Sequence, residues 1–255
     1  MILPEHHVPA VNTAASHENR IHSDEVAEQY GFRGGLVPGV NVYGCLTVPV
    51  VRYWGEQWLN RGWIKVRFRE PFYESEIVTV AAAVRDKAVI AVTAGRASAE
   101  AGLGGDSPAE SLQAHPLPAE RKVPATADIY GGRILGSFHT GLGETNARIT
   151  AALQDPLELY REYCHPTVLL GLANDILVQN FVLPAWIHTA SEVRNFCAAR
   201  ADESVEVRGI VREAFHKKGH EFLCADIGVY SAGGDLLTRV SHTAIWQPRL
   251  VKSAL

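Results

Sequence analysis

Apolar and polar residues alternate in several runs of this sequence, and the alternation predicts antiparallel β-strands with one face buried. The second half of the chain carries the clearest examples, from Ser204 to His216 and from Leu236 to Gln247. Turn residues such as those of "AGGD" separate successive runs. The predicted strand segments are 63–71, 76–84 and 88–97 in the first half and 187–196, 204–216, 220–231 and 236–247 in the second.

The apolar residues in the segment before each set of strands have a different spacing, which predicts a buried helix. In the second half, apolar residues from Thr167 to Leu183 recur three and four positions apart, around much of the helix circumference. The matching apolar segment in the first half is Gly39–Leu59. Pro49 lies in the middle of this segment and lacks a backbone N–H, so we expect a kink or a break near Val48.

Residues 99–122 differ in composition from the segments on either side of them. This segment is rich in Gly, Ser, Pro and Ala and has no periodicity, so it predicts a linker between an N-terminal unit, 1–98, and a C-terminal unit, 123–255. Each unit has the same predicted order: a short leading strand (8–12 or 136–140), a polar loop with a short helix, the long buried helix, and then the remaining strands.

The two units also carry a sequence repeat at an offset of 127 residues. Residues 66–86 align without a gap with residues 193–213, and seven of the 21 positions are identical. About one or two identities would be expected by chance at average residue frequencies. The same offset pairs Asn19 with Asn146. The repeat favours an internal duplication, with coincidence among Val-rich strands as the alternative.

These patterns together predict an α+β fold built twice. One buried helix followed by antiparallel strands is a helix wrapped by a sheet. Two such units in one chain can pair their sheets edge to edge, which hides edge strands that would otherwise be open to other chains.

Composition and charge exclude several classes of protein. Hydrophobic residues make up 47% and charged residues 20% of the 255 positions, which is typical of a globular protein. The net charge of −4 and the scattered basic residues argue against a nucleic-acid partner. No apolar run reaches about 18 residues and no signal-peptide pattern is present, so we expect a cytoplasmic protein without membrane contact. The four cysteines are far apart and His6-His7 lacks a third ligand, so we expect reduced thiols and no metal.

Two stretches carry a resemblance to a known family. "NRIHSDEVAEQYGFRGGLVPGV" and "WLNRGWIKVRFREPFYESEIVTV" are similar to MaoC-like proteins of the (R)-specific enoyl-CoA hydratase family, most clearly over residues 12–85. The second half resembles one such unit more loosely, through the repeat. The resemblance implies a double hot-dog fold, in which two helices are each rolled in an antiparallel sheet, and a hydratase or dehydratase activity on an acyl thioester.

The catalytic loop of that family is only partly present. Asn19, His22 and Asp24 match the family pattern, whereas His17 stands where the family has its catalytic Asp. In the family, the Asp and the His together activate one water molecule, and only the His is at its expected place here. At the matching place in the second half, Ile149 stands where His22 does, so we expect that half to lack a catalytic loop.

Hydration of an enoyl thioester builds negative charge on the thioester oxygen and needs an acid or base that works near neutral pH. A helix N-terminus can stabilise that charge with its backbone N–H groups. The glycine-rich "RGGLVPG" leads into the first buried helix, so we expect Gly39 as the oxyanion donor, with Val40 and Gly35 beside the substrate. His22 is the candidate acid or base because of the intrinsic pKa of imidazole; alternatively, it only flanks a helix start.

Asn19 and His17 complete the predicted catalytic set. Asn19 would orient the water or the His22 ring, or it would only end the loop by bonding its own backbone. His17 would share a proton with His22 as a second acid or base, or it would mark the loss of dehydratase chemistry. Further candidates, each with a structural alternative, are Glu18 as a replacement carboxylate, Asp24 in the first turn of a short helix and His165 at the start of the second buried helix.

The leading hypothesis is a hydratase or dehydratase whose substrate is carried by coenzyme A or an acyl carrier protein, with no other cofactor. The alternatives are a hot-dog thioesterase that uses Glu18 or Asp24, a non-catalytic subunit that binds acyl thioesters, and a cyclase in secondary metabolism. Candidate macromolecular partners are an acyl carrier protein and a second copy of the chain. The acyl chain, the pathway and the direction of the reaction stay open.

Overall fold

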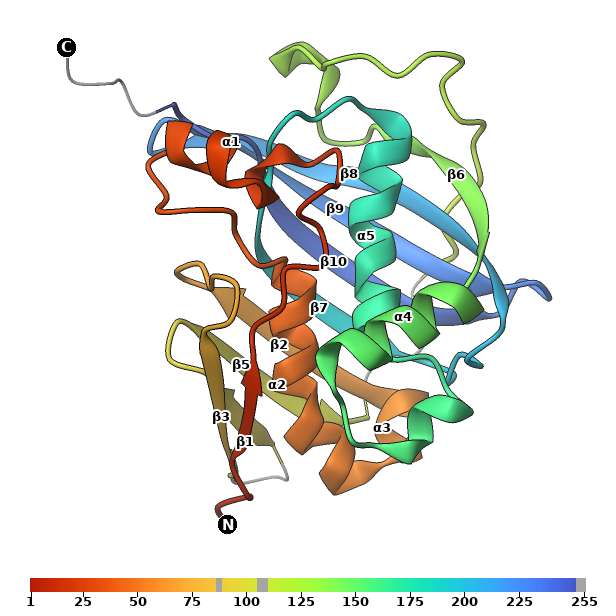
Figure 1. The fold of residues 1–255 in the computed structure, drawn as a ribbon. Coiled ribbons are helices and arrows are strands. Elements are labelled where there is room, and N and C mark those ends of the chain that lie inside the picture. The colour runs from red at the N-terminus through yellow and green to blue at the C-terminus, as the bar shows by residue number, and fades with distance from the viewer. Residues whose placement is uncertain (86–88, 105–109, 251–255) are drawn as a thin grey trace.

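The computed structural model describes residues 1–85, 89–104 and 110–250, and the strands in these residues form one antiparallel sheet (Figure 1). Their order across the sheet is β1-β3-β4-β5-β2-β7-β10-β9-β8-β6. The strands of the first half are β1 (His6–Pro9), β2 (Gly62–Phe68), β3 (Ile77–Val84), β4 (Ile90–Thr93) and β5 (Ala97–Leu103). Those of the second half are β6 (Ile134–Gly141), β7 (Ile187–Asn195), β8 (Ser204–Lys217), β9 (His220–Ser231) and β10 (Leu236–Gln247).

A long buried helix lies against each half of the sheet, as the apolar spacing predicts. These helices are α2 (Gly39–Trp54) and α5 (Pro166–Asn180), and they pack against each other (Figure 1). The shorter helices are α1 (Asp24–Gln29), α3 (Glu56–Arg61) and α4 (Gly143–Leu153), and single 3₁₀ turns lie at Arg20–His22, Thr126–Asp128 and Glu158–Arg161.

The two halves of the sheet join along β2 and β7. These strands pair antiparallel, with Ile64 opposite Val193. Each strand therefore covers the edge that the other would leave open, and β1 and β6 become the outer strands. The predicted edge-to-edge pairing of the two units is confirmed.

The positions of the elements repeat the sequence offset. α2 begins at Gly39 and α5 at Pro166, while β3 begins at Ile77 and β8 at Ser204. Both pairs of positions differ by 127 residues. The offset found in the sequence thus relates elements of the same kind in the same order, as a duplicated unit requires.

The break expected near Val48 is wrong, whereas the other expectation for that position, a kink in the helix, stays a prediction. α2 continues through Pro49 to Trp54, and the break comes at Gly55, whose φ is 59°. A positive φ is sterically costly for residues with a side chain, so glycine at this position allows the chain to turn into α3. Pro49 is tolerated because its missing N–H removes only one hydrogen bond from a helix that is buried along most of its length.

Two predicted boundaries also shift. β5 extends to Leu103 and pairs with β2, so the predicted start of the linker at residue 99 falls inside a strand. The leading strand predicted at 8–12 is observed at His6–Pro9, whereas the one predicted at 136–140 lies within β6. Position 88, the start of one predicted strand, and positions 105–109 of the predicted linker lie outside the described residues.

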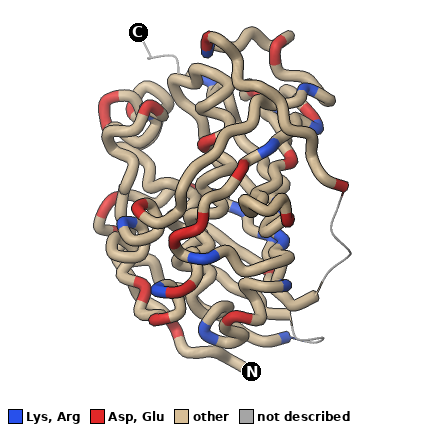
Figure 2. Tube along the Cα trace, turned by 90° about the vertical axis from the view of Figure 1, so that its right-hand side faces the viewer, with Lys and Arg blue, Asp and Glu red and all other residues tan. Residues whose placement is uncertain are grey.

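Charged residues of both signs are interspersed along the chain (Figure 2). Several form pairs, such as Arg239 with Asp226 and Lys65 with Glu192. Among the described helices, none is both long enough and apolar enough to cross a membrane.

His165 begins α5 as a structural residue. Its side chain is completely buried, and its Nδ1 accepts a hydrogen bond from the backbone N–H of Thr167 at 3.1 Å. Its Nε2 therefore carries the hydrogen and donates to Asp155 Oδ2 at 3.2 Å. Asp155 also accepts from the backbone N–H of Leu157. Because these groups are buried, each depends on the others for its hydrogen bonds.

Replacement of Asp155 by Ala should therefore destabilise the fold. It leaves the His165 N–H buried without an acceptor, and we expect the free energy of unfolding to fall by about 3 kcal/mol. Urea unfolding followed by tryptophan fluorescence would measure the change. The matched control is Asp235→Ala in an exposed turn, which should have little effect. Equal stability of the two variants would contradict this role for Asp155.

Candidate functional site

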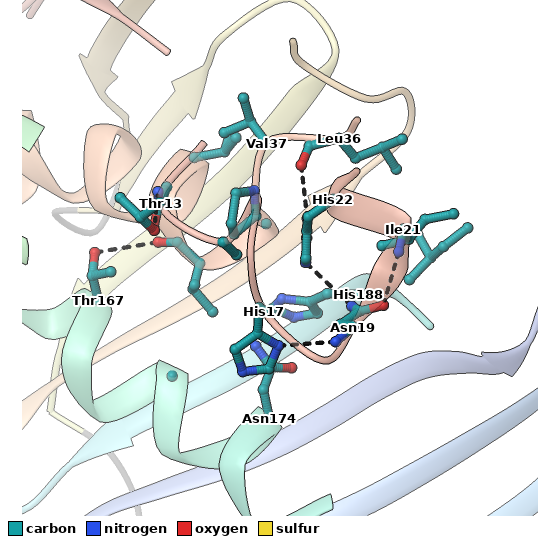
Figure 3. A pocket seen from close by; sticks show the side chains of 18 of the residues that line it. Thr13, His17, Asn19, Ile21, His22, Leu36, Val37, Thr167, Asn174 and His188 are labelled. Atoms are coloured by element: carbon teal, nitrogen blue, oxygen red, sulfur yellow. Dashed lines mark hydrogen bonds between the residues drawn. The ribbon is translucent and has the colours of Figure 1, made fainter. Parts of the chain in front are cut away.

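A cavity of about 400 Å³ lies between the two halves of the chain (Figure 3). Its walls are formed by the loop before α1, the start of α2, the middle of α5, the beginning of α4 and the beginning of β7. Of the residues predicted from the sequence, the cavity is lined by His17, Asn19, His22, Gly39 and Val40. The structure therefore brings the predicted catalytic set and the predicted oxyanion donor to one place.

His22 is held in one tautomer. Its Nδ1 lies 2.7 Å from the carbonyl oxygen of Leu36, so Nδ1 carries the hydrogen and donates it. The lone pair of the neutral ring is then on Nε2, which lies 3.2 Å from Asn19 Nδ2. Burial lowers the pKa of His22 to about 4; the Leu36 carbonyl opposes this shift, and His17 adds to it. His22 is thus neutral at pH 7, and its basic nitrogen, Nε2, accepts a hydrogen bond.

Asn19 fixes the loop before α1 to the second half of the chain. Its Oδ1 accepts from the backbone N–H of Trp186 at 3.0 Å, and its Nδ2 donates to the Trp186 carbonyl at 3.0 Å. The Oδ1 also accepts from Ile21 N, which caps the 3₁₀ turn at residues 20–22. These bonds set the orientation of the amide, so Nδ2 is the group that donates to His22 Nε2. Asn19 therefore both orients the His22 ring and begins the turn.

His17 is exposed and lies on the other side of Asn19. Its Nδ1 accepts from the backbone N–H of Asn19 at 3.1 Å, and its ring meets the Trp186 ring edge-on at 6.0 Å between centroids. The two histidines share no hydrogen bond; each ring bonds to Asn19 instead (Figure 3). The shared proton considered for His17 and His22 is not present in this arrangement. Neutral His17 carries its hydrogen on Nε2 and can act only as a donor there.

The start of α2 presents free backbone donors to the cavity. Asn41 N and Val42 N both donate to the Pro38 carbonyl. Within the described residues, no acceptor is assigned to the N–H groups of Gly39 and Val40, the first two residues of the helix. Pro38, at the N-cap, has no side chain that could accept from them. The electrostatics of a helix N-terminus favour a partial negative charge at this point.

Four other residues named from the sequence lie outside the cavity lining, and each has a structural role. Gly35 allows close approach, because a Cβ there would lie 2.2 Å from the His22 carbonyl oxygen. The carboxylate of Asp24 accepts from Gly35 N at 2.7 Å. Glu18 pairs with Arg121 at 3.0 Å. His165 caps α5, as described above. The positions of Glu18 and Asp24 contradict their use as a carboxylate in the cavity.

Sequence reasoning missed an acidic residue in the cavity. Asp175, on α5, lines it together with Asn174 and Arg148 of α4. Burial raises the pKa of Asp175 to about 6, although Arg148 acts in the opposite direction. The Oδ1 of Asn174 is buried without a hydrogen-bond partner. The signal was present in the sequence, since "ND" interrupts the apolar surface of the predicted helix from Thr167 to Leu183.

The comparisons with known proteins establish the fold. No family model matches the sequence, and no curated protein matches it. A solved structure described as a MaoC domain protein dehydratase from Chloroflexus aurantiacus J-10-fl is similar, with a TM-score of 0.67 and 10% identity over 98% of this chain and 95% of that one. A MaoC-like dehydratase has a TM-score of 0.59 and 11% identity, covering 97% of this chain and 98% of that one.

A third solved structure, RV0216 from Mycobacterium tuberculosis, is described as having a double hot-dog fold. Its TM-score is 0.61, with 13% identity over 95% of this chain and 96% of that one. The predicted fold is confirmed: this chain is a double hot dog.

Proposed function

We propose that this protein is a MaoC-like hydratase or dehydratase that acts on an acyl thioester. The observation that carries the proposal is the cavity that holds both a neutral histidine with a lone pair on Nε2 and the free backbone donors at the start of α2. The Asn19–His22 match to the (R)-specific enoyl-CoA hydratase family supports it. So does the similarity of the whole chain to two proteins described as dehydratases.

In the hydration direction, the chemistry requires one base and one charge-stabilising site. Water displaces the Asn19 amide from His22 Nε2, and Nε2 then removes a proton from this water as the water oxygen bonds to the β-carbon of the enoyl group. The electrons of the double bond move toward the carbonyl, and the negative charge collects on the thioester oxygen beside the N–H groups of Gly39 and Val40. A proton then bonds to the α-carbon and gives the 3-hydroxyacyl thioester. Dehydration follows the same steps in reverse.

Asp175 is the proposed source of that second proton. The family's catalytic Asp is replaced here by His17, and Asp175 is a carboxyl group on the other half of the chain that reaches the same cavity. Its pKa of about 6 leaves part of the population protonated near neutral pH, which suits a general acid. Proton exchange with solvent returns His22 and Asp175 to their starting states.

The structure gives less support to the thioesterase alternative. The carboxylates considered for it, Glu18 and Asp24, are bound to Arg121 and to Gly35 N and do not line the cavity. A hydratase is therefore the function that the cavity supports best.

The first test is turnover by the purified chain. Crotonyl-CoA and a longer trans-2-enoyl-CoA should both lose their conjugated enoyl-thioester absorbance, with the same acyl groups on an acyl carrier protein as a second series. Asp175→Asn should lower kcat by at least about tenfold, while Asp235→Asn in an exposed turn should not. Release of free thiol would instead identify a thioesterase, and binding without turnover would identify a binding subunit.

A further inference from the structure

A second histidine lies at the start of α2, and the sequence gives no motif for it. His188, on β7 of the second half, lines the cavity and is only 9% exposed. A Cβ on Gly39 would lie 3.1 Å from its Nδ1, so the ring is packed directly against the first residue of α2. Phe68 meets the same ring edge-on, with centroids 4.8 Å apart. The Nδ1 atom is buried and has no hydrogen-bond partner among the residues that the structure describes.

The other nitrogen of His188 belongs to a buried chain of polar groups. His188 Nε2 lies 2.8 Å from Ser191 Oγ, and Ser191 Oγ lies 3.2 Å from His242 Nδ1. The two imidazole rings lie against each other, with centroids 4.3 Å apart. His242 is fully buried, and within the described residues its Nε2 also has no partner. This series of polar groups thus ends in two unpartnered nitrogens: Nδ1 of His188, a residue that lines the cavity, and Nε2 of His242, a residue that does not.

Both histidines are neutral near pH 7. Burial, with a further contribution from His242, holds the pKa of His188 well below its usual range, although the Ala190 carbonyl acts in the opposite direction. Burial lowers the pKa of His242 to about 4. Each ring therefore carries one N–H. Ser191 has a single hydroxyl hydrogen, so it donates to one ring and accepts from the other.

Only two placements of these hydrogen atoms satisfy both hydrogen bonds of Ser191, the one to His188 and the one to His242. In one, His242 donates to Ser191, Ser191 donates to His188 Nε2, and the N–H of His188 is on Nδ1, beside Gly39. In the other, all directions are reversed, and His242 Nε2 carries an N–H that is buried without an acceptor. Orphaned buried N–H groups are rarer in proteins than unpaired acceptors. The first arrangement is therefore favoured, since a ligand in the cavity can accept from His188.

We propose that His188 Nδ1–H donates a hydrogen bond to the carbonyl oxygen of the bound thioester, next to the N–H groups of Gly39 and Val40. This inference rests on the proposed function, because it takes a thioester as the ligand. The oxyanion site then combines backbone donors of the first half with a side chain of the second half. Ser191 and His242 are positioning residues, which hold His188 in the tautomer that donates.

The test measures the carbonyl group directly and needs no turnover. Butyryl-CoA labelled with ¹³C at the carbonyl is saturated and cannot be hydrated. A hydrogen bond weakens the C=O bond, so the labelled band in the infrared spectrum should shift to lower frequency when butyryl-CoA binds. In His188→Leu the band should return part of the way to its position in water. His7→Leu is the matched control, because His7 is an exposed histidine outside the cavity lining, and it should leave the bound band unchanged.

Two further variants keep the inference falsifiable if His188→Leu does not fold. His188→Gln retains a side-chain N–H and should keep part of the shift. Ser191→Ala removes the hydrogen bond that holds His188 in the donating tautomer. It should therefore reduce the shift of the carbonyl band, while the affinity for butyryl-CoA stays almost unchanged. With an enoyl-CoA substrate, His188→Leu should lower kcat about 100-fold with KM nearly constant, as expected for loss of a donor that acts in the transition state.

The outcomes separate this inference from the proposed function. A bound band that is the same in the wild type and in both His188 variants would overturn the role of His188, even if hydration occurs. A shift that depends on His188, in a protein that does not hydrate enoyl-CoA, would support the role of His188 and overturn the hydratase. Failure to bind butyryl groups on coenzyme A and on an acyl carrier protein would overturn both.

Discussion

Replacement of His22 by Gln should lower the rate of enoyl-thioester hydration by about 10²–10⁴-fold. The glutamine side chain can still bond to the Leu36 carbonyl, but it offers no basic nitrogen to water. His22 Nε2 is the basic nitrogen of the ring, and it accepts a hydrogen bond from Asn19, which water displaces in the proposed reaction. The effect should therefore fall on kcat, because the substrate still meets the same walls and the same donors at the start of α2.

The pH dependence of this rate tests the role of His22 in a second way. Because burial lowers the pKa of His22 to about 4, the acid limb of kcat/KM that reports the base should lie near pH 4 and not near 6.5. The control is His7→Gln on β1, an exposed histidine outside the cavity, which should leave the rate unchanged. Wild-type turnover in His22→Gln would assign the base to another group.

Acid should destabilise the fold between about pH 6.5 and 4, well before most carboxylates are protonated. The pKa values of His22 and His242 are about 4 in the folded chain and 6.5 in an unfolded one. In this interval the unfolded chain binds protons that the folded chain does not, so the free energy of unfolding falls as pH falls. Each of the two residues contributes about 3 kcal/mol to the loss, and His188 adds to it in the same direction.

Asp175 acts with the opposite sign. The pKa of Asp175 is about 6 in the folded chain and 3.8 in an unfolded one, so the folded chain binds this proton at a higher pH. Acidification therefore raises the free energy of unfolding by about 3 kcal/mol through this group. The net loss from the three groups with stated values is then about 3 kcal/mol, before His188 is added. Urea unfolding at pH 7 and pH 4.5 would measure it. His242→Gln should reduce the difference between the two pH values, whereas a difference that does not change would contradict the burial of a neutral His242.

The sequence predicts the fold better than it predicts the site, for physical reasons. Alternation and helical spacing are local, so β8, β10 and α5 follow directly from them, and the 127-residue offset relates the two halves. The break at Gly55 was missed because Pro49 is the stronger local signal, while the positive φ of Gly55 depends on how α3 packs. Burial of the surrounding helix outweighs the loss of one hydrogen bond at Pro49.

At the site, the residues near one another in sequence were found and the distant ones were not. Asn19, His22 and Gly39 lie within one loop and the helix that follows it. His188 and Asp175 are more than 130 positions away in sequence, and they reach the cavity only because β7 pairs with β2 and α5 packs against α2. Glu18 was misassigned because its neighbour in space, Arg121, is 103 positions away in sequence.

The pairing of β2 with β7 within one chain also bears on the evolution of the two halves. In a symmetric dimer of identical units, every substitution appears at two equivalent sites, so neither site can specialise alone. Covalent fusion removes that restriction. The start of α5 has become sealed, with His165 and Asp155 buried against each other, while the start of α2 keeps an open cavity. We therefore expect one acyl group to bind per 255-residue chain, in a cavity whose lining includes His188 and Asp175 of the second unit.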